Sequence, residues 1–172
     1  MNLEQAIKTA LDYEGKVYRT YLEAMEASDD EVGQRVFRTL CNEEKEHVDY
    51  LRRRLEEWRT TGTVTVERLD TAIPNPAAIH AAVERLRAKV AGQPARKHDA
   101  ELELLRRALD VETETSDFYR QMVAALAADG RRLFERFVEI EDGHKTIVQA
   151  EIDCLSGSGF WFDTKEFDLS KG

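Results

Sequence analysis

The sequence predicts an all-α fold, a four-helix bundle with one long crossover connection and an aromatic C-terminal tail. Gly and Pro are sparse, at 9 and 3 of 172 residues, and apolar residues recur at three- and four-residue steps, the period of an amphipathic helix. The chain also repeats one arrangement of acidic, imidazole and aromatic residues at an offset of 97 or 98 positions. Because a chain of this length supports one domain with a full core, we expect a single domain over residues 1–172.

The first predicted hairpin consists of two long amphipathic helices. The first helix runs from about Asn2 to Ala27, and the Ser-Asp-Asp-Glu stretch at 28–31 predicts a capping box that ends the turn and starts the second helix. Each helix has one face that carries both apolar residues and carboxylates. These faces hold Leu3, Ile7, Leu11, Glu14, Tyr18 and Tyr21 on the first helix, and Phe37, Leu40, Glu44, His47 and Leu51 on the second.

Glu14 and Glu44 are predicted to lie level with each other in this hairpin. Glu14 is 14 residues before Ser28 and Glu44 is 16 residues after it, so at about 1.5 Å per residue an antiparallel hairpin brings the two carboxylates to the same height. Carboxylates on an apolar face are costly to bury unless a positive charge neutralises them. The two faces carry no basic residue near this level. We therefore prefer a bound cation to inward Glu side chains that pair with Arg or Lys.

Residues 61–98 are predicted to form a crossover between the two hairpins. The stretch from Thr60 to Pro76 is rich in Thr and contains Pro74, and a short amphipathic helix follows it. The apolar positions of this helix are Ile79, Val83, Leu86 and Val90. A connection of about forty residues is what the long helices on either side need in order to run side by side, rather than as a simple up-down bundle. We expect the crossover to pack across the bundle, and a separate interaction module is the alternative.

The second predicted hairpin repeats the first, with a less regular turn. Its helix faces hold Leu105, Leu109, Glu112, Ser116 and Tyr119, and then Phe134, Phe137, Glu141, His144 and Val148. The midpoint between Glu112 and Glu141 falls near Leu126, about three residues before the turn signal Asp129-Gly130. Either the helix before this turn ends early or the loop is longer than the turn signal indicates.

Each half of the repeat supplies one Glu on one helix and a Glu-x-x-His motif on the next. The six predicted metal ligands are Glu14, Glu44, His47, Glu112, Glu141 and His144. Hard carboxylate oxygens combined with two imidazoles suit iron or manganese, whereas structural zinc favours thiolates and a closed tetrahedral shell. By position, Glu44 and Glu141 would bridge two ions, and the other four residues would be terminal ligands.

Tyr21 and Tyr119 are the candidates for residues that support the site. They lie two helical turns beyond Glu14 and Glu112 and face the same way. Tyrosines in such places can orient ligand carboxylates by hydrogen bonding. Plain core packing is an equally good interpretation of both.

The C-terminal tail, residues 156–172, concentrates aromatic side chains. Phe160, Trp161, Phe162 and Phe167 lie here, in a chain with 7 Phe and 2 Trp residues. Aromatic side chains at this density need burial. We expect the tail to dock on the surface of its own bundle, with contact to a second subunit as the alternative.

The composition also excludes several kinds of partner and site. A net charge of −9 disfavours nucleic acid and anionic membranes. No apolar run approaches the length of a membrane span and the N-terminal helix lacks a signal-peptide core, so we expect a cytoplasmic protein. Cys41 and Cys154 are far apart with no Cys-x-x-Cys, which excludes a rubredoxin-type or zinc-ribbon site and gives no reason to infer a disulfide. His80 and His98 lie outside the repeat, and we expect both on the surface.

Several motifs resemble the rubrerythrin-like branch of the ferritin-like superfamily. They are the Ala-Leu-x-x-Glu openings at Ala10 and Ala108, Glu-Glu-Lys-Glu-His at 43–47, Asp-Phe-Tyr at 117–119, and Gly-Phe-Trp-Phe-Asp at 159–163 with Glu166-Phe167. The resemblance covers nearly the whole chain. It implies a ferritin-like bundle with a di-iron site that reduces hydrogen peroxide or O2, usually in homodimers, as a defence against oxidative stress.

Two departures from the family pattern bear on the expected activity. Full rubrerythrins carry a rubredoxin domain that delivers electrons, and because this chain has none we expect an external donor, such as a separate rubredoxin-type protein. They also carry an extra Glu one helical turn from the Glu112 position, to which an iron moves on changing redox state. Here the residues three before and three after are Leu109 and Thr115, which favours a simpler oxidase or ferroxidase over peroxidase turnover by that movement.

The leading hypothesis is therefore a di-iron oxidoreductase that acts on a small oxidant, H2O2 or O2. Two iron ions are the expected cofactor, with manganese as the alternative. Iron handling by a ferroxidase of the same fold is the second hypothesis, and a non-enzymatic helical scaffold that has kept its ligands is the third.

Overall fold

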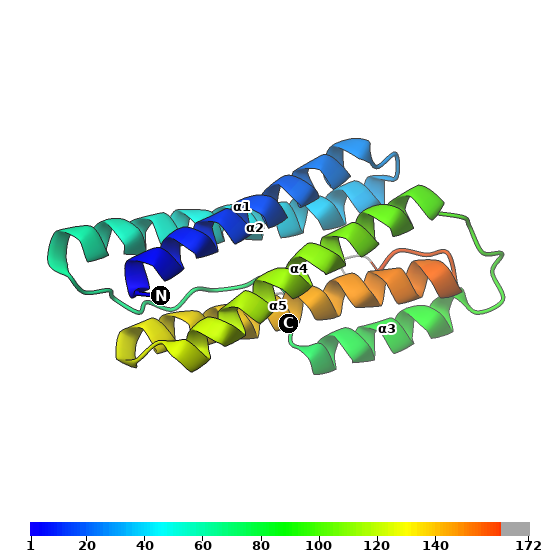
Figure 1. Cartoon of the computed structure of the whole chain (residues 1–172). Coiled ribbons are helices and arrows are strands. Elements are labelled where there is room, and N and C mark those ends of the chain that lie inside the picture. The colour runs from blue at the N-terminus through cyan, green and yellow to red at the C-terminus, as the bar shows by residue number, and fades with distance from the viewer. Residues whose placement is uncertain (163–172) are drawn as a thin grey trace.

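The predicted all-α bundle is confirmed by the computed structural model, which describes residues 1–162. In chain order the helices are α1 (Leu3–Ala27), α2 (Glu31–Thr61), α3 (Pro76–Val90), α4 (Asp99–Ala125) and α5 (Ala128–Gly157). Helices α1, α2, α4 and α5 form the bundle, and α3 lies outside it against α5 (Figure 1). None of the helices in the described range combines the length and the apolarity that a membrane span requires.

The turn between α1 and α2 is built by Asp30 rather than by the predicted Ser28 capping box. The Asp30 carboxylate accepts hydrogen bonds from the backbone N–H of Val32 (2.8 Å) and of Gly33 (3.0 Å), so Asp30 is the N-cap of α2. Ser28 ends α1 instead, and its hydroxyl accepts the N–H of Asp30 at 3.3 Å. A carboxylate directly before the first turn satisfies two free N–H groups and also favours the positive end of the helix dipole.

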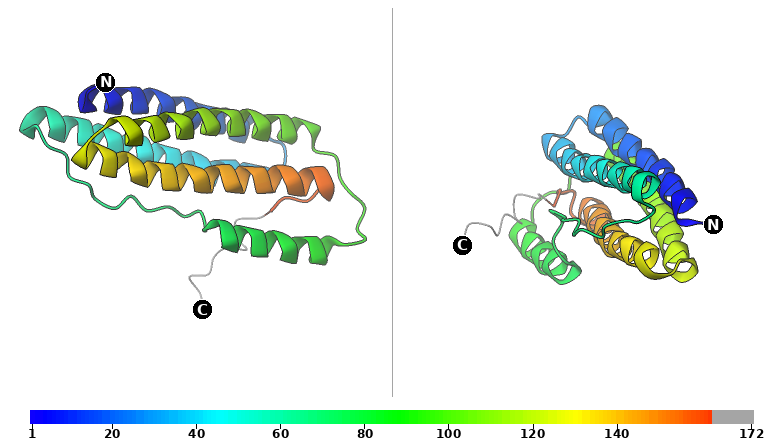
Figure 2. Two further views of the ribbon diagram at one scale, coloured as in Figure 1. Left: turned by 60° about the horizontal axis from the view of Figure 1, so that its bottom comes forward. Right: turned by 90° about the vertical axis from the view of Figure 1, so that its left-hand side faces the viewer.

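The crossover packs along the bundle. Helix α2 is capped after Thr61 by Gly62, whose φ of 73° is the left-handed conformation that glycine adopts easily. The Asn75 side chain then accepts the N–H of Ala78 at 2.9 Å, and Pro76 occupies the first turn of α3. Three residues of α3 at helical spacing are buried beside α5, namely Ile79, Val83 and Leu86. The views in Figure 2 place α3 at the side of α5, so α3 belongs to the same packed unit.

The turn of the second hairpin follows the first of the two alternatives, because α4 ends before the turn signal. Its last residue is Ala125, and α5 already begins at Ala128, so Asp129-Gly130 lies in the first turn of α5. Packing favours Gly130 there, since a Cβ at this position would lie 3.3 Å from side-chain atoms of both Leu126 and Leu3. The glycine therefore marks a close approach between helices.

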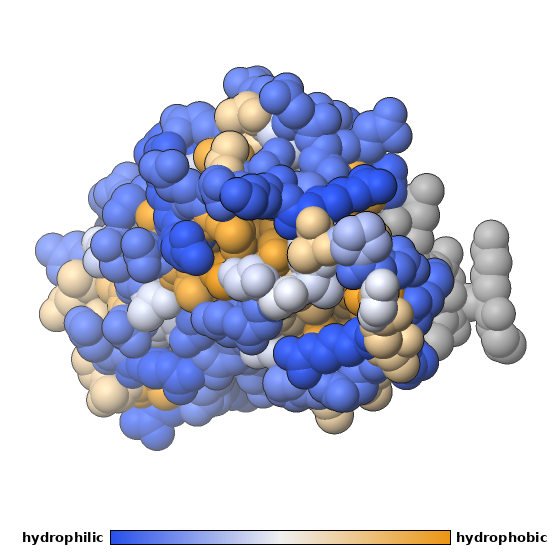
Figure 3. Space-filling view, turned by 90° about the vertical axis from the view of Figure 1, so that its right-hand side faces the viewer, coloured by the Kyte–Doolittle hydropathy of each residue, from blue (hydrophilic) through white to orange (hydrophobic). Residues whose placement is uncertain are grey.

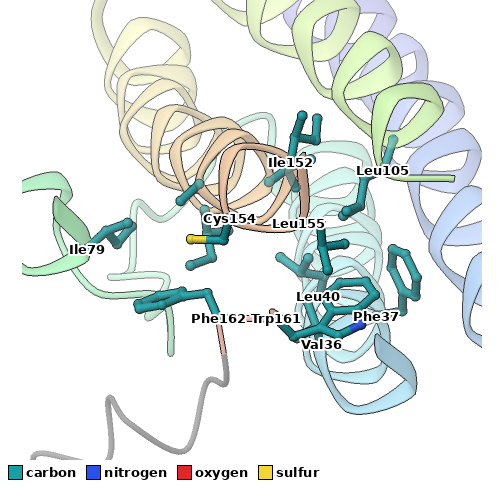
Figure 4. Packing of buried hydrophobic residues seen from close by; sticks show 14 of the residues in the cluster. Val36, Phe37, Leu40, Ile79, Leu105, Ile152, Cys154, Leu155, Trp161 and Phe162 are labelled. Carbon is teal, nitrogen blue, oxygen red and sulfur yellow. The ribbon is translucent and has the colours of Figure 1, made fainter. Parts of the chain in front are cut away.

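Residues 160–162 of the tail dock on the chain's own bundle. Phe162 is fully buried, and the Trp161 ring meets Phe37 edge-on with ring centroids 5.8 Å apart. Figure 4 shows both side chains against residues of α2 and α5. Phe167 and the rest of 163–172 lie outside the described residues.

His98 is not the surface residue that the sequence predicts. Its side chain is only 11% exposed, and its Nε2 lies 3.0 Å from the carbonyl oxygen of Gly159, which ties the linker before α4 to the start of the tail. Gly159 has φ of 73°, and a Cβ there would overlap the backbone of Arg96. His80, by contrast, is exposed as expected.

The surface of the described residues exposes few large apolar side chains. Met1 and Val66 are the exposed large hydrophobic residues in this range, at 65% and 38%. The end of the bundle where α4 begins is mostly hydrophilic, with apolar side chains visible in a hollow between polar ones (Figure 3).

Candidate metal centre

The core is divided into two apolar clusters, and a polar layer lies between them. On α1, Ile7 belongs to one cluster and Val17 to the other; on α2, Leu40 and Leu51 are divided in the same way. The six predicted ligands all fall in the gap, on α1, α2, α4 and α5, and they are between 0% and 1% exposed. The helical faces that the sequence predicts therefore bring all six side chains into one buried layer.

Within this layer the side chains form two groups that could each hold a metal ion. One group is Glu14, Glu44, His47 and Glu141, the other is Glu44, Glu112, Glu141 and His144, and the ligand atoms of each group lie within 4.8 Å of one another. Both groups contain Glu44 and Glu141. Two shared carboxylates are the arrangement that bridging ligands require, and it agrees with the roles assigned by position. That these side chains bind ions stays a prediction.

The Nδ1 atom of His47 faces the first group. It lies 3.2 Å from Glu14 Oε2, 3.3 Å from Glu44 Oε2 and 3.6 Å from Glu141 Oε1. A ring nitrogen surrounded by three carboxylate oxygens is placed to bind the same cation as those oxygens. The opposite nitrogen, Nε2, is buried and has no hydrogen-bond partner among residues 1–162.

His144 presents its Nδ1 to the second group in the same way. This atom lies 2.7 Å from Glu44 Oε1, 3.5 Å from Glu112 Oε1 and 4.0 Å from Glu141 Oε2. The rings of His47 and His144 are stacked, with centroids 5.4 Å apart and planes 11° apart. The two halves of the repeat therefore meet as near-equivalent half-sites.

Both predicted tyrosines donate hydrogen bonds to ligand carboxylates, but each one does so across the bundle. The hydroxyl of Tyr21 donates to Glu112, and the hydroxyl of Tyr119 donates to Glu14. The sequence places each tyrosine on the helix of its own Glu, about 10 Å further along. The tyrosines contact the opposite helix because α1 and α4 pack antiparallel. Each tyrosine lies seven residues beyond its own Glu, and the two helices run in opposite directions, so each tyrosine lies beside the Glu of the other helix.

Most oxygens in the layer have no donor that satisfies them. Both oxygens of Glu44 and of Glu141, and one of Glu112, are buried without a hydrogen-bond partner among the described residues. Buried polar atoms are normally paired, and unpaired carboxylate oxygens are especially costly. Five such oxygens that converge with two imidazoles fit a pair of hard cations, which would neutralise the charge and accept the free lone pairs.

The protonation of the layer in the metal-free protein follows from burial and mutual repulsion. Burial, followed by the charge of Glu44, raises the pKa of Glu14 to about 8, and burial raises the pKa of Glu141 well above its usual range. Burial lowers the pKa of His47, but the charges of Glu44 and Glu14 outweigh it and raise this pKa to about 10. The layer therefore holds protons at neutral pH, which incoming cations have to displace.

Glu43 is a residue of the site that the sequence reasoning missed. Its carboxylate is buried, and its Oε2 lies 2.7 Å from Nε2 of His144, on the side of the ring away from the other ligands. The repeat gives no signal for it, because the corresponding residue of the second half is Ile140. Its position directly before Glu44 turns it by about 100° around α2 from the direction of Glu44.

The position of the extra carboxylate of rubrerythrins holds no ligand here. Thr115 is fully buried, and its hydroxyl donates to the carbonyl of Val111 on its own helix at 2.8 Å. Leu109, on the other side of Glu112, is only partly buried. Neither residue supplies a carboxylate to the layer.

Comparison with known families gives one match. The family model described as Rubrerythrin matches residues 1–55, which span α1 and most of α2 and include Glu14, Glu44 and His47. Neither a curated protein nor a solved structure matches the chain. The second hairpin lies outside the matched residues, but it repeats their ligand pattern and builds the other half of the same layer. Residues 1–55 are thus similar to the Rubrerythrin family, which supports the rubrerythrin-like resemblance of the chain.

Proposed function

We propose that the protein is a di-iron oxidoreductase that reduces hydrogen peroxide or O2. The observation that carries the proposal is the pair of four-residue groups that share Glu44 and Glu141. Two iron ions bound at such a pair supply two electrons together to a small oxidant. Manganese is the second metal that this donor set suits.

The chain's own residues prepare the site for that chemistry. Tyr21 and Tyr119 hold the carboxylates of Glu112 and Glu14 in orientation, so the terminal ligands do not have to be ordered when ions bind. The apolar clusters on either side of the layer exclude water, which strengthens the attraction between ligands and cations.

An electron donor outside the described residues completes the proposal. Cys41 and Cys154 are both buried and free, and they lie on different helices, α2 and α5, so the described part of the chain contains no thiol pair for redox work. We propose a separate donor of the rubredoxin type, a homodimeric assembly and a cytoplasmic location. These three parts rest on the sequence and on the family resemblance.

Ferroxidase activity is the second candidate, and Thr115 favours it. With a threonine that bonds to its own helix in place of an extra carboxylate, an ion at Glu112 has no second Glu three residues away on α4 to move to. A site that oxidises Fe(II) and releases it needs no such movement.

Metal analysis and oxidant consumption test the proposal together. Iron-replete protein is expected to hold two ions per chain, and its reduced form to consume H2O2 or O2 in stopped-flow mixing. Glu44→Ala with Glu141→Ala is expected to abolish the two-ion site, because it removes both shared carboxylates. Retention of two ions by this variant would mean that other carboxylates hold them, and binding of fewer than two ions by the wild type would refute the proposal. Net iron release after oxidation, without turnover, would identify the ferroxidase.

A further inference from the structure

The two imidazoles of the layer differ in what lies behind them. Nε2 of His144 has the Glu43 carboxylate at 2.7 Å, whereas Nε2 of His47 is buried and unpaired within residues 1–162. The repeat explains the difference, because Ile140 stands at the position that corresponds to Glu43 and is 2% exposed. One half-site has a carboxylate behind its histidine, and the other half of the repeat has an aliphatic residue at the corresponding sequence position.

Glu43 is held in place by the crossover. The hydroxyl of Thr71 donates to its Oε2 at 2.7 Å, and the backbone N–H of Ala72 donates to its Oε1. Both oxygens therefore have donors from a segment that belongs to neither hairpin. A carboxylate fixed in this way does not lose conformational freedom when His144 becomes a ligand.

A carboxylate behind a ligand histidine changes its strength as a ligand. By accepting the Nε2–H of His144, Glu43 selects the tautomer whose lone pair is on Nδ1, the atom that faces Glu44 and Glu112. It also makes the imidazole more basic. Loss of such a partner commonly lowers metal affinity by about 10- to 100-fold.

Glu43 could instead be regarded as a ligand, because it forms a third group of potential ligands with His47 and His144. A neutral imidazole has one lone pair on nitrogen. When Nδ1 of His144 binds a cation, Nε2 carries the proton and is a donor. Glu43 is therefore an acceptor for His144 in the loaded protein, and this third group does not compete with the other two.

We propose that Glu43 is a positioning residue for His144 and that it makes the two metal positions unequal, so that the ion at His144 leaves more slowly than the ion at His47. The inference rests on the proposed function in one respect, that two ions are bound. It does not depend on which oxidant is used.

Release of Fe(II) into an excess of chelator under anaerobic conditions tests the inference. Wild-type protein is expected to release its ions in two phases of equal amplitude, with rates that differ by about 10- to 100-fold. Glu43→Gln keeps the side-chain size but removes the negative charge, so the slow phase should accelerate about 10-fold and the fast phase should stay unchanged. Glu46→Gln is the matched control, because Glu46 is an exposed residue on the same helix and the substitution removes the same charge. It should leave both phases unchanged.

Two further variants test the role of Glu43 from other directions. Thr71→Val removes one of its two anchors and should accelerate the slow phase less than Glu43→Gln does. Ile140→Glu places a carboxylate at the corresponding position behind His47 and should slow the fast phase.

The outcomes separate this inference from the proposed function. Wild-type protein that binds fewer than two ions refutes the proposed function. Protein that binds two ions but releases them in a single phase, or whose slow phase is the same with Glu43→Gln, overturns the inference alone. Equal acceleration by Glu46→Gln would also overturn it, since the effect would then be one of general charge.

Discussion

Tyr119 and Tyr21 show how single residues of one hairpin control ligands of the other. Each hydroxyl donates to the terminal Glu of the opposite half, so the orientation of Glu14 is set by α4 and that of Glu112 by α1. The apolar environment lowers the dielectric around these bonds and strengthens them.

Removal of the Tyr119 hydroxyl should therefore weaken metal binding. Tyr119→Phe leaves Glu14 without its donor, and we expect the affinity of the first ion group to fall by about 10-fold. Chelator competition at fixed pH measures this. Tyr50→Phe is the control, because the Tyr50 hydroxyl donates to the carbonyl of Glu67, outside the layer. An equal loss in both variants would assign the effect to general destabilisation.

The sequence predicts the residues of the layer well where they repeat and fails where they do not. Glu14 and Glu112 are found because the same residue types recur in the same helical register. The repeat does not identify Glu43, because the corresponding residue of the second half is Ile140. The hydrogen-bond acceptor of each tyrosine could not be predicted for another reason. It depends on how α1 packs against α4 and not on the period of either helix.

At the scale of the elements, the positions of the helices are predictable and their ends are less so. The midpoint near Leu126 correctly locates the second turn, because two level ligands fix where an antiparallel hairpin reverses. The Asp129-Gly130 signal misleads, since that glycine serves the contact with Leu3 and Leu126. Local turn chemistry and close packing favour the same small residues, and only the tertiary structure separates the two causes.

The contact between α2 and the tail predicts a coupled pair of substitutions. A Cβ on Gly33 would lie 2.6 Å from the Trp161 ring and 2.9 Å from Ser28, so Gly33→Ala should displace the tail and cost about 1–3 kcal/mol. In a Trp161→Ala background the same change should cost much less. Urea denaturation of the four proteins in this cycle measures the coupling. Gly15→Ala, whose Cβ would meet only the flexible end of Arg19, should be neutral or stabilising, and additivity in the Gly33 cycle would contradict the contact.

At the scale of the whole molecule, the buried carboxylates, which are the side chains most costly to remove from water, lie between the two hairpins. Four carboxylates at 0% exposure lie together, and ions that bind the folded state alone stabilise it by mass action. Chelation should therefore lower the melting temperature. Calorimetry of loaded and stripped samples measures the shift, and equal melting temperatures would show that the layer is not a metal site.

The metal-free protein should lose stability as the pH rises from about 4.5 to 10. Glu14 has a pKa raised from 4.5 to about 8, and His47 one raised from 6.5 to about 10. A group whose pKa is raised by folding contributes its full stabilisation at pH values below its pKa in the unfolded state. This stabilisation is lost as the pH rises through its pKa in the folded state. Glu44 has the opposite shift, with stability already fully present above pH 4.5. Thermal melts of the stripped protein between these pH values test the direction, and a rising melting temperature would contradict it.

The crossover allows the two halves of the chain to evolve separately. Two separate, identical hairpins that met about a twofold axis could build the same layer, since each half supplies three ligands and a tyrosine for the other. Every mutation would then appear on both sides of the axis at once. In a single chain joined through residues 62–98 this constraint is absent, so one half can keep Glu43 while the other carries Ile140. Covalent linkage thereby turns a pair of interchangeable positions into two that selection can adjust separately.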